Sequence, residues 1–150
     1  MRKLALGFTL IELLVVISII GILATLVSAN LNSARSRARD AQRKSDLKNL
    51  STALRLYYND EAAYPVDGGF VFSGSFENAA TGTVYIEEVP NDPLYDPSDA
   101  TSPQYHYDQT NDGDGFTLSA CLENKSDAGG GSVTVPGWTC STAWVFQLKQ

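Results

Sequence analysis

The sequence predicts an α+β protein in which a long N-terminal α-helix packs on a small antiparallel β-sheet. Three patterns predict this fold class: an apolar opening segment, a continuation rich in helix-favouring residues, and a C-terminal third that alternates apolar residues with turn signals. A chain of 150 residues has room for one modest globular domain behind such a helix.

The first part of the helix is expected over residues 8–31, which contain a single charged residue, Glu12. These 24 residues span roughly 36 Å as a helix, enough to cross a hydrocarbon core of about 30 Å. A charge within a membrane helix costs roughly 2.5–3.5 kcal/mol, so Glu12 predicts a functional role. A nearby helix N-terminus or a cationic partner would offset this cost, and a merely dipole-stabilised interfacial residue is the simpler alternative.

Residues 32–58 are expected to continue the helix as an amphipathic segment. One face carries apolar residues at helical spacing: Leu47, Leu50, Leu54 and Tyr57. This face is predicted to pack on the globular domain, residues 59–150. The Arg and Lys side chains between positions 35 and 48 indicate a solvated face, with lipid headgroups or acidic neighbouring molecules as alternative contacts.

The globular domain is expected to begin with loops and to end in antiparallel strands. Over residues 70–100, short apolar stretches alternate with turn-forming residues, so we expect loops with one short helix or strand at most. Strands are expected at residues 105–108, 116–122, 133–135 and 143–146. The segment 111–115, Asn-Asp-Gly-Asp-Gly, is a strong turn signal between the first two strands.

Charge and motifs exclude several classes of function. The net charge is +6 over residues 1–55 and −12 over residues 56–150. An acidic domain is unsuited to phosphate backbones, so no direct nucleic-acid binding is expected. The sequence contains no nucleophile elbow, phosphate-binding glycine loop or metal-binding helix motif, and therefore predicts no enzyme.

The stretch GFTLIELLVVISIIGILA, which begins at Gly7, resembles the prepilin signal of type IV pilins and type II secretion pseudopilins. The resemblance implies that a prepilin peptidase removes a leader of residues 1–7 by cutting after Gly7 and then methylates Phe8. It also implies that Glu12 guides assembly. Val89-Pro90 and Asp92-Pro93, followed by Tyr105-His106-Tyr107, resemble a loop and strand of major pseudopilins.

The resemblance implies a structural subunit of a homo-oligomeric filament that assembles through the transmembrane helix of residues 8–31. Before assembly the chain would cross the inner membrane once, in contact with lipid; afterwards it would lie in an extracellular or periplasmic filament. The implied partners are the prepilin peptidase, an inner-membrane assembly platform and an ATPase. Pilus and secretion pseudopilus remain open. A simple positive-inside count, by contrast, would place the C-terminal side in the cytoplasm.

A rival interpretation is an ordinary signal peptide, cut after Val27-Ser28-Ala29, on a secreted or membrane-anchored monomeric binding module. The mature chain would then begin at Asn30 instead of Phe8.

The extracytoplasmic location implied by the resemblance gives the two cysteines a role. Cys121 and Cys140 then predict a disulfide, with two free thiols as the alternative. No cofactor is required. Four residues with side-chain oxygens near the predicted turn are candidate calcium ligands, with a solvated hairpin turn as the simpler alternative: Asp108, Asn111, Asp112 and Asp114.

Overall fold

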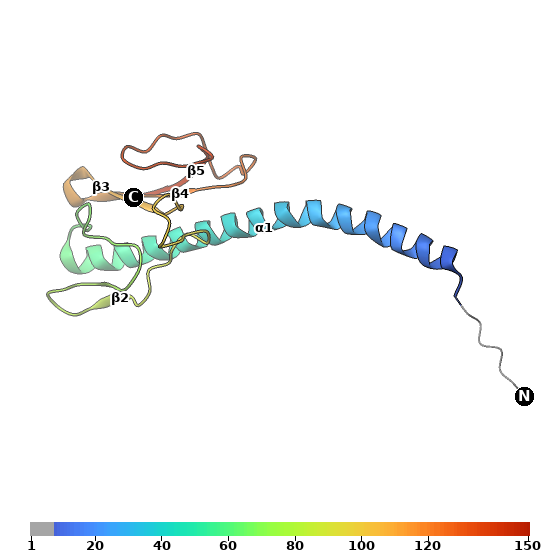
Figure 1. Cartoon of the computed structure of the whole chain (residues 1–150). Coiled ribbons are helices and arrows are strands. Elements are labelled where there is room, and N and C mark those ends of the chain that lie inside the picture. The colour runs from blue at the N-terminus through green and yellow to red at the C-terminus, as the bar shows by residue number, and fades with distance from the viewer. Residues whose placement is uncertain (1–7) are drawn as a thin grey trace, which may run out of the picture. The chain divides into compact units, whose positions relative to one another are not determined.

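The structure is a computed structural model that describes residues 8–150, except for the side chains of residues 26–29. The predicted leader and its last residue, Gly7, lie outside the described residues. The chain forms two units, Met1–Ser36 and Arg37–Gln150, which are described separately. Helix α1, Leu10–Glu61, runs through both (Figure 1).

In the first unit, α1 is apolar and long enough to cross a membrane, as the sequence predicts. It begins at Leu10, two residues later than expected, because Thr9 caps its first turn. The hydroxyl groups of Ser18 and Thr25 donate to the backbone oxygens of Leu14 and Ile22, both at 2.7 Å. These two hydroxyl groups are thus satisfied by the helix itself, which a membrane requires.

In the second unit, the predicted apolar face of α1 is confirmed. Leu47, Leu50 and Leu54 are fully buried in the core. The helix ends at Glu61, three residues beyond the predicted boundary. It stops there because Ala62 adopts a left-handed conformation, with φ 56°, while its N–H still bonds the Tyr58 oxygen at 2.8 Å.

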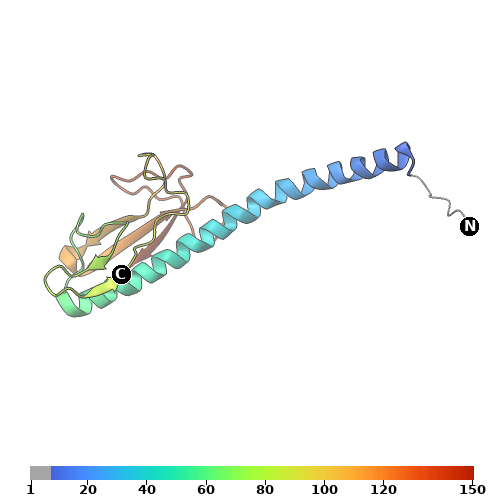
Figure 2. The same ribbon diagram turned by 60° about the horizontal axis from the view of Figure 1, so that its bottom comes forward.

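The core sheet has the order β3–β4–β5, with β3 His106–Thr110, β4 Gly115–Cys121 and β5 Val145–Lys149. Both pairings are antiparallel, and Leu118 of β4 lies opposite Tyr107 on one side and Leu148 on the other. Tyr107 and Leu118 are buried in the same core as the leucines of α1. Figure 2 shows the sheet lying along the C-terminal turns of the helix.

Two strand predictions need correction. Residues 133–135 form only an isolated bridge, between Val135 and Trp138, because Pro136 lacks an N–H and Gly137 turns the chain with φ 73°. The last strand begins at Val145 instead of Ala143, because Ala143 has a φ of 55°, which is incompatible with a strand.

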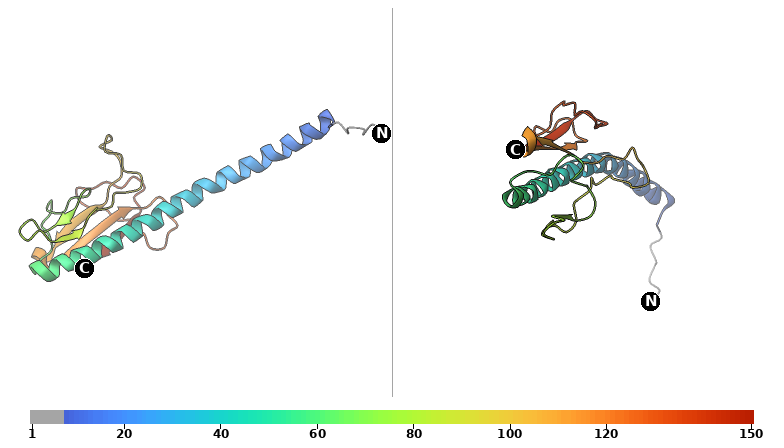
Figure 3. Two further views of the ribbon diagram at one scale, coloured as in Figure 1. Left: turned by 90° about the horizontal axis from the view of Figure 1, so that it is seen from below. Right: turned by 90° about the vertical axis from the view of Figure 1, so that its left-hand side faces the viewer.

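A second, two-stranded sheet occupies the region that was expected to hold one short element. It consists of β1, Phe76–Glu77, and β2, Val84–Ile86. The ring centroids of Phe76 and Tyr85 lie 5.3 and 5.5 Å from that of Tyr57 on α1. In Figures 1 and 3, this hairpin and the three-stranded sheet lie on different sides of the last turns of α1.

Candidate functional site

The start of α1 contains a capping box built from Thr9 and Glu12. The backbone N–H and the hydroxyl of Thr9 donate to Glu12 Oε2 at 2.8 and 2.6 Å. In return, the Glu12 N–H donates to the Thr9 hydroxyl at 3.3 Å. Two backbone donors that a helix start leaves unpaired are thereby satisfied. Glu12 lies in the first turn of α1, as the sequence predicts, where the helix dipole favours an anion.

The capping box leaves one carboxylate oxygen of Glu12 for a further partner. Both bonds from Thr9 go to Oε2, and Oε1 accepts no hydrogen bond from any residue that the structure describes. The surrounding surface is apolar and is lined by Phe8, Ile11, Val15 and Val16. A cationic group that reached Oε1 would pair with the carboxylate beside apolar side chains that exclude water. The electrostatic attraction is strong there because the local dielectric constant is low.

The described apolar side chains at the start of α1 are exposed. Phe8 is 79 % exposed and Leu10 81 %, and the same holds along the helix for Ile11, Leu13, Leu14, Val15, Val16, Ile17, Ile19, Ile20, Ile22 and Leu23. Soluble monomers do not expose a continuous apolar surface of this length, so lipid or other helices must cover it.

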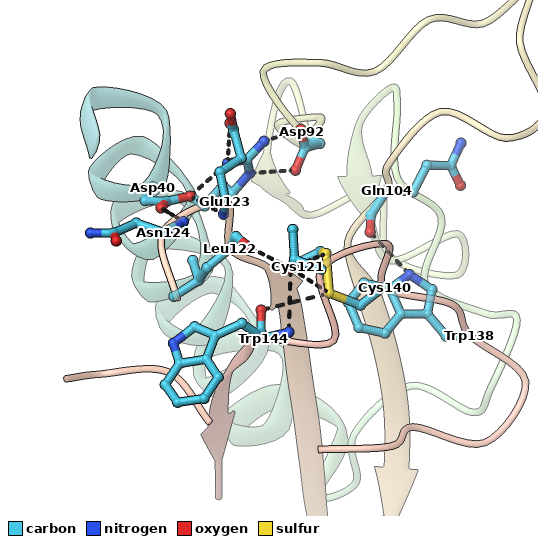
Figure 4. Close-up of a disulfide and its surroundings, with 12 residues drawn as sticks. Asp40, Asp92, Gln104, Cys121, Leu122, Glu123, Asn124, Trp138, Cys140 and Trp144 are labelled. Carbon is cyan, nitrogen blue, oxygen red and sulfur yellow. Dashed lines mark hydrogen bonds and ion pairs between the residues drawn. A yellow bond between two sulfur atoms is a disulfide. The ribbon is translucent and has the colours of Figure 1, made fainter. Parts of the chain in front are cut away.

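In the second unit, α1 carries a buried cation, Arg43, of which only 1 % is exposed. Its Nε and Nη2 donate to the two carboxylate oxygens of Asp92 at 2.7 and 2.9 Å. Its Nη1 donates to Asp40 at 2.7 Å and to Glu123 at 2.8 Å. Asp92 lies on the loop between Pro90 and Pro93, so this planar fork fastens the helix to that loop (Figure 4).

The prediction of a solvated basic face is therefore wrong at Arg43, although it holds at the exposed Arg37 and Lys48. Three carboxylates compensate the buried charge, and two of them come from distant segments of the chain. The sequence signals were weak: Asp40 and Arg43 at i and i+3, and an aspartate, Asp92, close to two prolines.

The residues around Arg43 extend the network to the loop after β4. Arg39 binds Glu123 through two hydrogen bonds of 2.7 and 2.6 Å, and Asp40 accepts the backbone N–H groups of Glu123 and Asn124. The hydrogen bonds from Arg39, followed by those from Arg43, lower the pKa of Glu123 to about 2 against the effect of burial. For Arg43, burial alone would lower the pKa, but the hydrogen bonds to Asp92 and Glu123 outweigh it and raise that pKa.

A second buried polar contact joins Asp46 of α1 to Tyr105, the residue that precedes β3. The Tyr105 hydroxyl donates to Asp46 Oδ2 at 2.8 Å, in a buried position. Burial, with the bond to Asp46, raises the pKa of Tyr105, so the hydroxyl remains a donor at all physiological pH values.

The predicted disulfide between Cys121 and Cys140 is confirmed, with a Cα–Cα distance of 5.2 Å. It joins the end of β4 to the loop that precedes β5 (Figure 4). Gly131 lies inside the bridged segment and exchanges backbone hydrogen bonds of 2.9 and 2.7 Å with Val145. Gly130 is pressed against Trp144, where a Cβ would lie 2.4 Å from the indole nitrogen. The bridge therefore holds the glycine-rich segment on the sheet.

The four candidate calcium ligands are not gathered around one point. Asp108, on β3, lies 3.0 Å from His106 Nε2 and lines one pocket with Thr117. Asp114 accepts a hydrogen bond of 3.4 Å from the Tyr58 hydroxyl and lines a different pocket.

The other two candidates form the predicted turn. Asn111 and Asp112 have φ values of 54° and 53° within the short 3₁₀ helix η1, Asn111–Gly113. Over the part of the chain that the structure describes, no group of three or more His, Cys, Asp or Glu side chains is placed to hold a metal ion.

Comparisons with known proteins bear on both units. Residues 2–28 match the family model of the prokaryotic N-terminal methylation motif. The chain is 36 % identical to the type II secretion system core protein G of Klebsiella pneumoniae over 107 residues, which cover 67 % of this chain and 76 % of that protein. The core protein G of Aeromonas hydrophila is 36 % identical over 104 residues, 65 % of this chain and 73 % of that protein.

The type IV major pilin protein PilA of Myxococcus xanthus is 40 % identical over 58 residues, which cover 39 % of this chain and 26 % of that protein. No solved structure matches the chain. The apolar helix with its capped glutamate, the sheet packed on the distal half of the helix and these similarities agree. The chain therefore belongs to the family of type IV pilins and type II secretion pseudopilins.

Proposed function

We propose that the chain is a major pseudopilin, the core subunit of a filament in a type II secretion system. The observation that carries this choice is the length of the similarity to the core protein G of Klebsiella pneumoniae. Those 107 residues exceed the 61 that precede and form α1, so the similarity includes part of the globular domain. The similarity to the pilin PilA spans 58 residues, which is no longer than the N-terminal helical region itself.

Processing would create the cation that Glu12 lacks. A cut after Gly7 gives Phe8 a free amino group, within one helical turn of Glu12 along the chain. This amine, on the same chain or on a neighbour, is a suitable partner for Oε1. A paired charge enters an apolar helix bundle at a lower cost than a single one, so pairing would favour the correctly aligned neighbour.

Assembly would then exchange lipid for sister helices around the exposed apolar surface of the first unit. Before assembly, the helix would hold the chain in the inner membrane with the globular domain outside the cytoplasm, where the disulfide is stable. A platform protein and an ATPase of the inner membrane would drive the extraction from lipid. The assembled filament would lie in the periplasm or at the cell surface.

The proposal is tested by deleting the gene in the native bacterium and restoring it with the natural chain, Glu12→Ala or Glu12→Gln. We expect loss of enzyme secretion on deletion and recovery only with the natural chain. Both variants should still insert and should still give a mature chain that begins at methylated Phe8, as read by mass spectrometry.

Three outcomes would contradict parts of this proposal. Normal secretion after deletion, with surface fibres lost, would make the chain a pilin. A mature chain that begins at Asn30 would favour the monomeric binding module. Normal filaments from Glu12→Ala would remove Glu12 from the assembly mechanism.

A further inference from the structure

One side of α1 in the second unit carries cations without a partner. Arg37 and Lys48 are exposed, and neither side chain makes an ion pair or hydrogen bond with a described residue. They are 11 residues apart, about three helical turns, so they project from the same side about 16 Å from each other. The exposed Ala41 and Ser45 lie between them. We call these four residues the cationic helix face.

The neighbouring cations of α1 are neutralised within the chain. Arg39 and Arg43 bind Glu123, and Lys44 binds Asp127. No described residue thus supplies an anion to the cationic helix face, although the second unit is strongly acidic. Its small central side chains allow another backbone to approach closely.

Unpartnered acidic side chains gather on the β1–β2 hairpin and the two residues that follow it. Glu77, Glu87 and Glu88 are exposed, and their carboxylates form no bond with any residue between 8 and 150 that the structure describes. Phe76 pairs with Ile86, so Glu77 and Glu87 flank that pair. Val84, 48 % exposed, gives the hairpin an apolar centre. We call this surface the acidic hairpin.

Within one molecule the two surfaces lie on different sides of α1. The segment after the hairpin binds Arg43 through Asp92, and Arg43 projects about 120–140° around the helix from Arg37 and Lys48. The hairpin packs on Tyr57 of α1, and the Tyr85 hydroxyl donates to Asp60 Oδ2 at 2.9 Å. Tyr57 lies 9 residues beyond Lys48 and 20 beyond Arg37, which corresponds to about 14 and 30 Å along the helix axis. A second copy, displaced along the axis by a distance in this range, would bring its hairpin level with the cationic helix face.

We propose that the cationic helix face of one copy binds the acidic hairpin of a second copy in the filament. This inference rests on the proposed function and adds the surface by which neighbouring globular domains recognise each other. Each surface repels its own kind and attracts the other, so the charges favour one axial offset over its alternatives.

Anionic lipid is the less suitable occupant of the cationic helix face. The headgroup layer of one leaflet is about 5–8 Å thick. Two cations about 16 Å apart along a helix fit in that layer together only where this part of the helix lies nearly parallel to the membrane surface. The acidic hairpin offers three exposed carboxylates to these two cations.

The test reverses the charges on each surface and then on both. The variants are Arg37→Glu with Lys48→Glu, Glu87→Lys with Glu88→Lys, and all four together. Glu and Lys are both good helix formers, so α1 should persist. We expect each double variant to lower the assembled fraction of mature chain at least fivefold, and the fourfold variant to recover most of it. High salt should weaken assembly of the natural chain in the same direction.

Lys149→Glu is the matched control, because Lys149 is an exposed cation at the end of β5, away from both surfaces. It should assemble normally. An independent measurement uses filaments made from Lys48→Cys and Glu88→Cys chains together, treated with a short bis-maleimide. Crosslinked dimers of the two chains are expected, whereas Lys149→Cys paired with Glu88→Cys should give none.

The outcomes separate this inference from the proposed function. If the natural chain forms filaments and the double variants do too, or if the fourfold variant is as defective as the worse double variant and no crosslink forms, the inference is wrong and the proposed function stands. If only the helix variant is affected, through weaker binding to anionic vesicles, the face binds lipid. If the natural chain forms no filament, both are overturned.

Discussion

The two units use the same helix in opposite ways. In the first unit, Leu10 and Ile22 are 81 % and 63 % exposed, whereas Leu47 and Leu50 in the second unit are fully buried. A large apolar side chain gains about 1.5–3 kcal/mol when it leaves water. The second unit obtains this gain from its own sheet. The first unit must obtain it from lipid or from other chains, which is the physical reason for an assembling protein.

The charged groups show the same contrast. Glu12 bonds only to Thr9, three positions away, within the first turn. Arg43 binds Asp92 and Glu123, which are 49 and 80 positions away. A local bond leaves the first unit able to change partners, from lipid to filament. Long-range bonds fix the globular domain on its half of the helix.

The largest effect on stability is expected from Arg43→Ala, which removes the long-range ion pairs of the second unit. Removal of one partner leaves buried carboxylates without a counter-charge, which costs about 3–5 kcal/mol. We expect a markedly lower melting temperature of the second unit, followed by near-ultraviolet circular dichroism of the full chain in detergent. Arg37→Ala, an exposed cation on the same helix, is the control and should change stability by less than about 0.5 kcal/mol. Equal melting temperatures for the two variants would show that the network does not hold the domain.

The next largest effect is expected from loss of the disulfide, which stabilises only the second unit. Replacing both Cys121 and Cys140 by Ser opens a loop of about 20 residues and is expected to lower the free energy of unfolding by about 3 kcal/mol. The same optical signal measures it, with and without reductant. Reductant should destabilise the natural chain and leave the double variant unchanged. A natural chain insensitive to reductant under unfolding conditions would contradict the bridge.

A smaller effect is expected from acid. The pKa of Glu123 falls from an ordinary 4.5 to about 2 on folding, so its contribution to stability is complete above pH 4.5 and is lost as the pH falls toward 2. The melting temperature of the natural chain should decline more steeply between pH 5 and 2 than that of Glu123→Gln, which cannot titrate at this position. Parallel curves would show that Arg39 and Arg43 do not hold this carboxylate in its charged form.

The contrast also explains what the sequence could predict. The apolar segment, the position of Glu12 in the first turn and the buried face of Leu47, Leu50 and Leu54 depend on spacings of three or four residues, which periodicity reveals. The single cysteine pair left one possible bridge. These features needed no knowledge of the fold.

The missed features depend on contacts between distant segments. Nothing near Arg43 in the sequence indicates that Asp92 and Glu123 will surround it, so no pattern distinguishes it from the exposed Arg37. The β1–β2 hairpin was missed because its strands have two and three residues, too short for an alternating pattern. Asp108 and Asp114 are close in sequence, but Asp108 lies on β3 and Asp114 follows η1, and the two line different pockets.

The smallest expected effect concerns the local bond of the first unit. Thr9→Ala removes the hydroxyl that donates to Glu12 Oε2 and accepts from the Glu12 N–H, and the loss of such a cap costs about 1 kcal/mol. In micelles, the backbone N–H groups of the first turn should then exchange with solvent about fivefold faster. Thr9→Ser retains the hydroxyl and should exchange as the natural chain does.

The second unit should not respond to either substitution at Thr9, because the bonds of the capping box stay within one helical turn. A change in its melting temperature would mean that the start of α1 is coupled to the globular domain. The contrast between a locally bonded first unit and a second unit held by distant contacts would then fail. If the first turn exchanged at the natural rate in Thr9→Ala, the apolar surroundings would be sufficient to hold the helix start. Glu12 would then keep both oxygens for an external cation.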